Sequence, residues 1–169
     1  MNALPASLLA LALAASAGPA FARSSDRNQP MDVDANHTNC AVGDDSGPCT
    51  FTGNVRIVQG TLRINAASAD LRRGGGDIQK VFLSGAPVQM EQQLDNGQQV
   101  TANSSRVEYD LQSETVVFIG NATLSKPDGS LSGDRIVYNM ANGQVQAGGG
   151  ENSRVKVRFL PKNRGTKGG

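Results

Sequence analysis

The stretch that decides the fold runs Phe51-Thr-Gly-Asn-Val-Arg-Ile-Val-Gln-Gly-Thr-Leu-Arg-Ile-Asn-Ala66. It recurs loosely as Leu83-Ser-Gly-Ala-Pro-Val-Gln-Met90 and as Phe118-Ile-Gly-Asn-Ala-Thr-Leu124. In each copy a large apolar residue stands two positions before a glycine, and apolar residues then alternate with polar ones. Alternation with a period of two gives a strand one apolar and one polar face. The pattern therefore predicts a stack of short antiparallel strands that share one continuous apolar face.

Turn signals follow each copy, at Gly60, Asn96-Gly97 and Asp128-Gly129, and a returning strand follows each turn. Asn142-Gly143 is a further hairpin signal. If every glycine-containing break separates two strands, the chain holds about fifteen short strands. Pro87 fits the edge or the start of one of them, because it cannot donate a ladder hydrogen bond.

Residues 1–22 have the features of a secretory signal peptide. An apolar run begins at Leu8, and Ala20-Phe-Ala22 forms a small-x-small cleavage site. We expect cleavage after Ala22 and export of the remaining chain. The apolar run is too short to span a bilayer, although a retained anchor is an alternative. Residues 23–160 are expected to form a single domain, and residues 161–169 a disordered basic tail.

The balance of charge argues against a nucleic-acid-binding protein. The chain carries 16 basic and 15 acidic residues, which gives a formal net charge of +1. A nucleic-acid-binding domain of this size would show a marked basic excess. Basic residues gather after Glu151, and those within residues 161–169 are expected to belong to a solvated tail.

Cys40 and Cys49 flank a segment rich in turn residues. An exported chain meets an oxidising compartment, so these two residues are predicted to form a disulfide. Closing so short a loop adds roughly 2–3 kcal/mol of stability through chain entropy. A metal site would need more ligands, and His37 is the only histidine. We therefore predict no metal site and no cofactor.

No catalytic constellation is recognisable. The single histidine has no neighbouring nucleophile motif, and neither HExxH nor CxxC occurs. Carboxylates such as Glu108 and Asp110 alternate with apolar residues and therefore lie on the polar face of a strand. A glycosidase with two carboxylates is an open alternative without positive support. The sequence favours a protein that is not an enzyme.

Five segments carry a family resemblance: Gln29-Pro-Met-Asp-Val33, residues 51–66, Asp95-Asn-Gly97, Phe118-Ile-Gly-Asn-Ala122 and Gly133-Asp-Arg-Ile-Val-Tyr138. They resemble the LptA/OstA-like family of periplasmic lipopolysaccharide-transport bridge proteins, over about residues 26–161. The resemblance implies an all-β fold, a twisted antiparallel β-jellyroll that is open at both ends. The cysteine pair and the longer first hairpin loop depart from the common pattern of the family.

The resemblance also implies a groove that holds the acyl chains of lipopolysaccharide. The expected groove residues are Met31, Val33, Val55, Ile57, Ile64, Leu83, Val88, Met90, Val107, Tyr109, Leu111, Phe118, Leu124, Ile136 and Tyr138. Met31 and Val33 are expected to contact a neighbouring molecule as well. Val155, Val157 and Phe159 are the candidates for a C-terminal docking edge, in a strand whose charge–apolar alternation is typical of an exposed edge.

The implied partners are the lipid A part of lipopolysaccharide, the inner-membrane transport complex with its membrane-anchored OstA-like component, and the outer-membrane translocon. The resemblance further implies that copies of the protein associate head to tail. The alternative is a structural or adhesive exported β-solenoid that carries no lipid. A filled interior with paired ends would favour that alternative.

Overall fold

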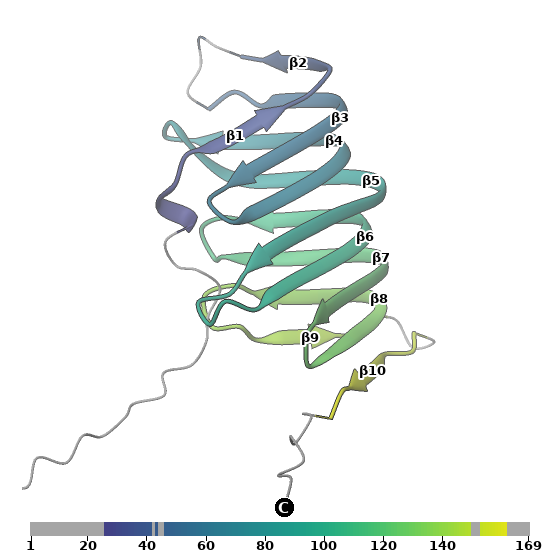
Figure 1. Ribbon diagram of the computed structural model, residues 1–169. Helices are drawn as coiled ribbons and strands as arrows, with labels where there is room; N and C mark the ends of the chain where they lie inside the picture. Colours follow the sequence, from purple (N-terminus) through teal and green to yellow (C-terminus); the bar gives the residue numbers. More distant parts are fainter. Residues whose placement is uncertain (1–25, 42, 44–45, 150–152, 162–169) are drawn as a thin grey trace, which may run out of the picture.

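The computed structural model describes residues 26–41, 43, 46–149 and 153–161. The predicted signal peptide, residues 1–22, and residues 162–169 of the predicted tail lie outside this part. The ten strands of the described residues form one antiparallel sheet, in the order β1-β3-β4-β5-β6-β7-β8-β10 (Figure 1). Strand β2 also pairs with β3, and β9 with β8, so the sheet begins and ends at unclosed edges. The prediction of an open, all-β jellyroll is confirmed.

A single 3-10 turn, η1 (Asp26–Asn28), precedes the strands. The strands are β1 (Met31–Asp34), β2 (His37–Cys40), β3 (Cys49–Gln59), β4 (Leu62–Gly74), β5 (Asp77–Gln93), β6 (Gln99–Asp110), β7 (Thr115–Lys126), β8 (Gly129–Asn139), β9 (Val145–Ala147) and β10 (Lys156–Phe159).

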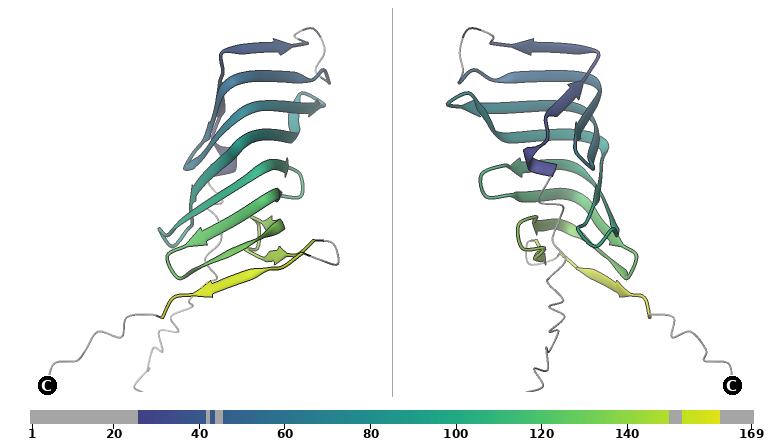
Figure 2. Two further views of the ribbon diagram at one scale, coloured as in Figure 1. Left: turned by 90° about the vertical axis from the view of Figure 1, so that its right-hand side faces the viewer. Right: turned by 60° about the vertical axis from the view of Figure 1, so that its left-hand side comes forward.

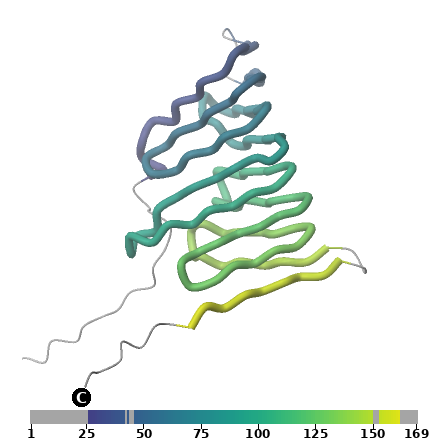
Figure 3. The backbone as a smooth tube through the Cα atoms, turned by 45° about the vertical axis from the view of Figure 1, so that its right-hand side comes forward, coloured from purple at the N-terminus to yellow at the C-terminus, as the bar shows by residue number. Residues whose placement is uncertain are grey.

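The six long strands, β3 to β8, bend in the middle and fold the sheet over into two limbs (Figures 1 and 3). Shifts of pairing register mark the bends, for example between Thr52 and Val55 and between Ser84 and Val88. Limb A holds the half-strands 49–52, 68–74, 77–84, 106–110, 115–119 and 135–139, together with β2 and β9. Limb B holds 55–59, 62–65, 88–93, 99–103, 122–126 and 129–133, together with β1 and β10.

The bend has a local cause in the repeated sequence. Gly53-Asn54 in β3 and Gly120-Asn121 in β7 have consecutive left-handed φ angles, 79° and 49° in the first pair and 79° and 48° in the second. Glycine adopts this conformation without steric cost, and asparagine tolerates it better than other residues. A residue pair of this kind inserted in a strand forms a bulge and turns the chain. In these two copies of the repeat the glycine therefore bends a strand, whereas Gly85 of the remaining copy has no positive φ.

This finding corrects the predicted number of strands. The described residues form ten strands, not about fifteen, because the glycine breaks within the repeats lie inside continuous strands. Pro87 likewise lies inside β5, at the register shift between Ser84 and Val88, and not at the edge or start of a strand. A bulge accepts proline because the residue there makes no ladder hydrogen bond.

We predict that Gly120→Ala lowers the free energy of unfolding by about 1–2 kcal/mol, because alanine is strained at a positive φ. Its Cβ would also lie 3.0 Å from the Ser105 hydroxyl oxygen. Urea denaturation followed by circular dichroism measures this loss. Gly133→Ala is the control, because Gly133 has an ordinary φ and a Cβ there meets nothing nearer than 3.7 Å. Equal stability of the two variants would contradict the proposed cause of the bend.

Candidate functional site

Limb B carries an unbroken apolar row from the first edge of the sheet to the last. Each member is the cross-strand partner of the next, from Val33 on β1 to Val157 on β10. Cross-strand partners place their side chains on the same face of a sheet. The row consists of Val33, Ile57, Ile64, Met90, Ala102, Leu124, Leu131 and Val157.

Limb A carries two corresponding rows. One runs Phe51, Ala69, Leu83, Val107, Phe118, Ile136 and Ala147, and the other Cys49, Leu71, Val81, Tyr109, Val116, Tyr138 and Val145. Residues of both limbs belong to a single hydrophobic cluster. The folded-over sheet thus supplies both walls of one apolar interior.

The structure brings the predicted groove residues together in this interior. All of them are at most 4% exposed except Met31, Val33 and Leu111, which are half buried and pack against the same cluster. The predicted set omitted several members of the rows, among them Leu71, Val81, Ala102, Val116 and Leu131. These residues follow the same period-two alternation as the predicted groove residues, so the sequence pattern was sufficient to include them.

The interior opens at the C-terminal end of the sheet. A cleft of about 180 Å³ lies there, lined by the apolar side chains of Leu124, Leu131, Val145, Val157 and Phe159 together with polar neighbours. On β10, Val157 is 50% exposed and Phe159 84% exposed. The apolar face of limb B therefore continues onto an edge strand that no second layer of the described residues covers.

The apolar side chains predicted for the docking edge are all exposed. Val157 and Phe159 lie on β10, and Val155 lies just before it, because this strand begins at Lys156. Leu160, which follows the strand, is exposed as well. Surface leucine, valine and phenylalanine residues clustered at one place usually mark a contact surface.

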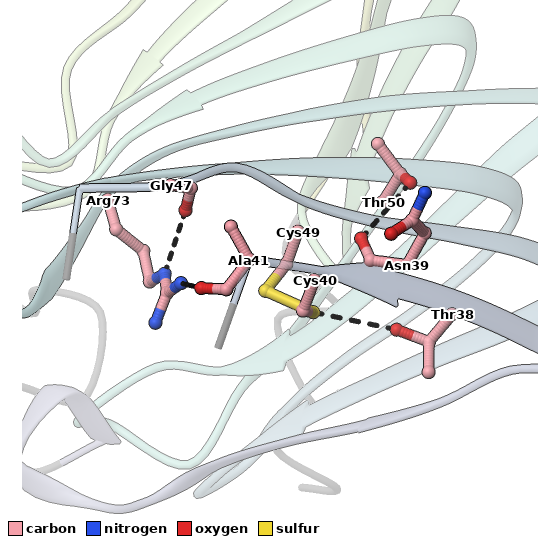
Figure 4. The surroundings of a disulfide bond; sticks show 8 residues. All are labelled: Thr38, Asn39, Cys40, Ala41, Gly47, Cys49, Thr50 and Arg73. Carbon is pink, nitrogen blue, oxygen red and sulfur yellow. Dashed lines mark hydrogen bonds between the residues drawn. A yellow bond between two sulfur atoms is a disulfide. The ribbon is translucent and has the colours of Figure 1, made fainter. Parts of the chain in front are cut away.

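The N-terminal end of limb A is held by a disulfide, as predicted. Cys40 and Cys49 are directly opposite each other on β2 and β3 and are bonded. The Arg73 guanidinium from β4 donates hydrogen bonds to the carbonyl oxygens of Gly47 at 3.0 Å and Ala41 at 2.8 Å (Figure 4). The disulfide and the arginine together fix the first hairpin against the sheet.

The interior offers apolar surface and few charged groups. Within the described residues, no three His, Cys, Asp or Glu side chains are placed to hold a metal ion. None of the helical segments in the described part is long and apolar enough to cross a bilayer. Tyr109 and Tyr138 are buried, and burial raises the pKa of each phenol, while the charge of Arg27 partly opposes the rise at Tyr109. Such an interior can bind hydrocarbon.

The fold and this interior define a class: an open β-jellyroll with an apolar interior that reaches an exposed edge. Residues 32–144 match the family described as LptA/(LptD N-terminal domain) LPS transport protein. The chain belongs to this family.

Known proteins of the family resemble most of the chain. The chain is 34% identical over 156 residues to the lipopolysaccharide export system protein LptA of Escherichia coli K12. This match covers 91% of the chain and 83% of the Escherichia coli protein. The Haemophilus influenzae protein of the same name is 34% identical over 84% of this chain and 83% of its own length. The crystal structure of LptH from Pseudomonas aeruginosa superposes with a TM-score of 0.73 over 81% of this chain and 99% of that one, at 24% identity. This last likeness concerns the fold.

The buried tyrosines predict a loss of stability in alkali. A phenol whose pKa is raised in the folded state binds its proton more tightly there, so stability is intact below the unfolded pKa near 10 and falls as the pH rises above it. Phenolate absorbance should therefore appear together with unfolding. The chain has two tyrosines, both interior, and no tryptophan, so absorbance near 295 nm (about the phenolate band) reports these residues alone. Ionisation of both phenols near pH 10 (about the pKa of a free tyrosine) without unfolding would contradict the burial.

Proposed function

We propose that this protein is a periplasmic carrier of lipopolysaccharide and a structural bridge between the transport machinery of the two membranes, without catalytic activity. Membership of the family supports this, and its relatives in Escherichia coli and Haemophilus influenzae are named lipopolysaccharide export system proteins. The observation that carries the proposal is the apolar row of limb B, which runs from edge to edge and ends on exposed β10.

Acyl chains are the part of the cargo that this interior suits. Burying hydrocarbon is worth roughly 0.8 kcal/mol per methylene, and no catalytic group is needed to hold it. The opposing rows are packed into one hydrophobic cluster. Acyl chains must therefore part the limbs and replace side-chain contacts with contacts to lipid. The residues proposed to line the path are those predicted from the sequence, with the added members of the rows.

The two edges of limb B fit a head-to-tail assembly. Strand β1 is antiparallel to β3, and β10 is antiparallel to β8. Because the intervening strands alternate in direction, β10 of one copy would be antiparallel to β1 of the next. Pairing of exposed edge strands would extend the sheet through the unpaired N–H and C=O groups. The apolar row would then continue from Val157 of one copy to Val33 of the next.

The outer faces of these two edges are also complementary in charge. Asp32 and Asp34 are exposed on β1, and Lys156 and Arg158 are exposed on β10. Opposite charges favour the correct register and speed association more than they add affinity. A contact between different surfaces that does not close into a ring produces a filament.

The remaining parts of the proposal follow from the sequence. A signal peptide cleaved after Ala22 would direct the domain, residues 23–160, to the periplasm. The N-terminal edge would meet either another copy or the membrane-anchored OstA-like component of the inner-membrane complex, and the C-terminal edge would meet another copy or the outer-membrane translocon. The uncovered apolar strand β10 supports this reading over a structural β-solenoid, which would have a filled interior and paired ends.

Photocrosslinking from position 109 tests the carrier. A photoreactive phenylalanine analogue replacing Tyr109 is expected to form an adduct with added lipopolysaccharide, and unlabelled lipopolysaccharide should compete with that adduct. The control places the same analogue at Phe82, whose side chain is half buried on the outer face, between the interior residues Val81 and Leu83. No adduct at Tyr109, or equal adducts at both positions in variants that fold normally by circular dichroism, would reject the groove.

The double variant Val157→Asp/Phe159→Asp tests the assembly. Two carboxylates on β10 should weaken self-association by at least about tenfold, because they remove apolar surface that the next copy would bury. Sedimentation velocity over a concentration series measures the change. Val137→Asp, on the half-buried outer face of limb A, is the control. Association that persists unchanged in the double variant would place the docking edge elsewhere.

A further inference from the structure

The short N-terminal turn connects the free tips of the two limbs. The limbs join at the bend, and their opposite ends form the open side of the folded sheet, where η1 lies between them (Figure 2). The tip of limb B includes the β3–β4 turn and the end of β5, and the tip of limb A includes the β6–β7 turn. The polar contacts described below reach from residues 26–29 to both tips.

Contacts to limb B involve a buried carboxylate. Asp26 is only 4% exposed. Its Oδ2 accepts a hydrogen bond from the Thr61 hydroxyl and lies 3.5 Å from the Gln92 amide nitrogen. The Gln59 amide donates to the carbonyl oxygen of Gln29 at 3.2 Å. Gly60, at φ 58°, lacks the Cβ that would collide with the Asp26 carboxylate.

The contact to limb A is an ion pair. Arg27 pairs with Glu114 in the β6–β7 turn, and the two side chains are 32% and 20% exposed. Arg27 also lies near enough to the interior Tyr109 for its charge to affect the pKa of that phenol. A single three-residue turn therefore holds limb B through one side chain and limb A through the next.

The contacts of residues 26–29 with the limb tips can be broken at moderate cost. They are polar, and water can replace each partner when the turn moves away. Two atoms are incompletely satisfied in the closed state: Gln92 Oε1 and Glu114 Oε2 are buried and have no hydrogen-bond partner among the residues that the structure describes. Burial of an unpaired polar atom costs free energy, so hydration of these two atoms offsets part of the loss on opening.

We propose that residues 26–29 form a strap that closes the lateral opening of the apolar interior, and that release of Arg27 from Glu114 admits acyl chains between the limbs. This inference rests on the proposed carrier function. The strap tethers the limb tips while the interior is empty of lipid, and the bend acts as the hinge. Release of the Arg27 end frees limb A, while the more numerous contacts of Asp26 and Gln59 keep the segment attached to limb B.

Reversal of the ion pair tests the strap. Labelled lipopolysaccharide in self-quenched aggregates is mixed with the mature protein, and the rise in fluorescence gives the rate of capture. Arg27→Glu and Glu114→Arg should each accelerate capture by up to about fivefold, the upper end of what loss of a partly exposed ion pair produces. The double variant Arg27→Glu/Glu114→Arg restores opposite charges and should return the rate to that of the wild type.

The control is Arg72→Glu, which reverses one charge of an exposed ion pair with Asp70 inside the single strand β4. It should leave the rate unchanged. If the wild-type protein captures no lipopolysaccharide, the proposed function fails. If the wild type captures it and the single variants match its rate, or the double variant fails to reverse their acceleration, the strap is rejected and the carrier stands. Asp26→Ala provides a second variant, expected to accelerate capture by detaching the strap from limb B.

Discussion

A pair of left-handed residues in the middle of a strand is the constraint on which this structure depends. Gly53-Asn54 and Gly120-Asn121 turn β3 and β7 within their own length, and the register shifts of the other long strands continue the bend along the sheet. Without the bend, the apolar rows would lie on one face of a flat sheet, with no second layer to bury them. With it, a single sheet provides both walls of its own interior. Successive side chains of a strand point to opposite faces, so every second residue of each strand points into this interior.

The bend leaves two edges that a closed barrel would not have. A barrel removes its edge strands by pairing the last with the first. Here β1 and β2 end the sheet on one side and β9 and β10 on the other. The disulfide and Arg73 stiffen the first edge, whereas β10 exposes its apolar side chains. Because β1 and β10 lie on the same limb and run in opposite directions, a second copy can continue that limb without any change of topology. The apolar row of limb B crosses the strands from β1 to β10. A second copy added at either of these edges would extend the row in the same direction.

The sequence predicted the interior better than it predicted the strands. A period of two identifies an inward residue whether the strand is straight or bent, so residues such as Phe118 and Ile136 were assigned correctly. The same period cannot distinguish a turn from a bulge, since both need glycine, and the strand count was wrong for this reason. The strap was missed because residues 26–29 have no periodicity. A signal existed elsewhere: Gln59 and Gln92 stand in phase with the apolar residues before them, and both are buried. A polar residue at an inward position indicates that a polar partner covers it.

The packing of the interior bears on how a cargo can be both held and passed on. The rows of the two limbs bury each other in one cluster, so an entering acyl chain would gain less than the roughly 0.8 kcal/mol per methylene of transfer from water. Part of that gain is offset by the side-chain contacts that the lipid replaces. A rigid, empty groove would bind hydrocarbon more tightly and release it more slowly. In a folded sheet, contacts between the two limbs compete with the lipid for the same apolar surface, and this competition lowers the affinity for lipid. The surface remains apolar, so selectivity for hydrocarbon chains is kept. In the proposed head-to-tail assembly, weak and competitive binding along a continuous row would allow lipid to move from one copy to the next.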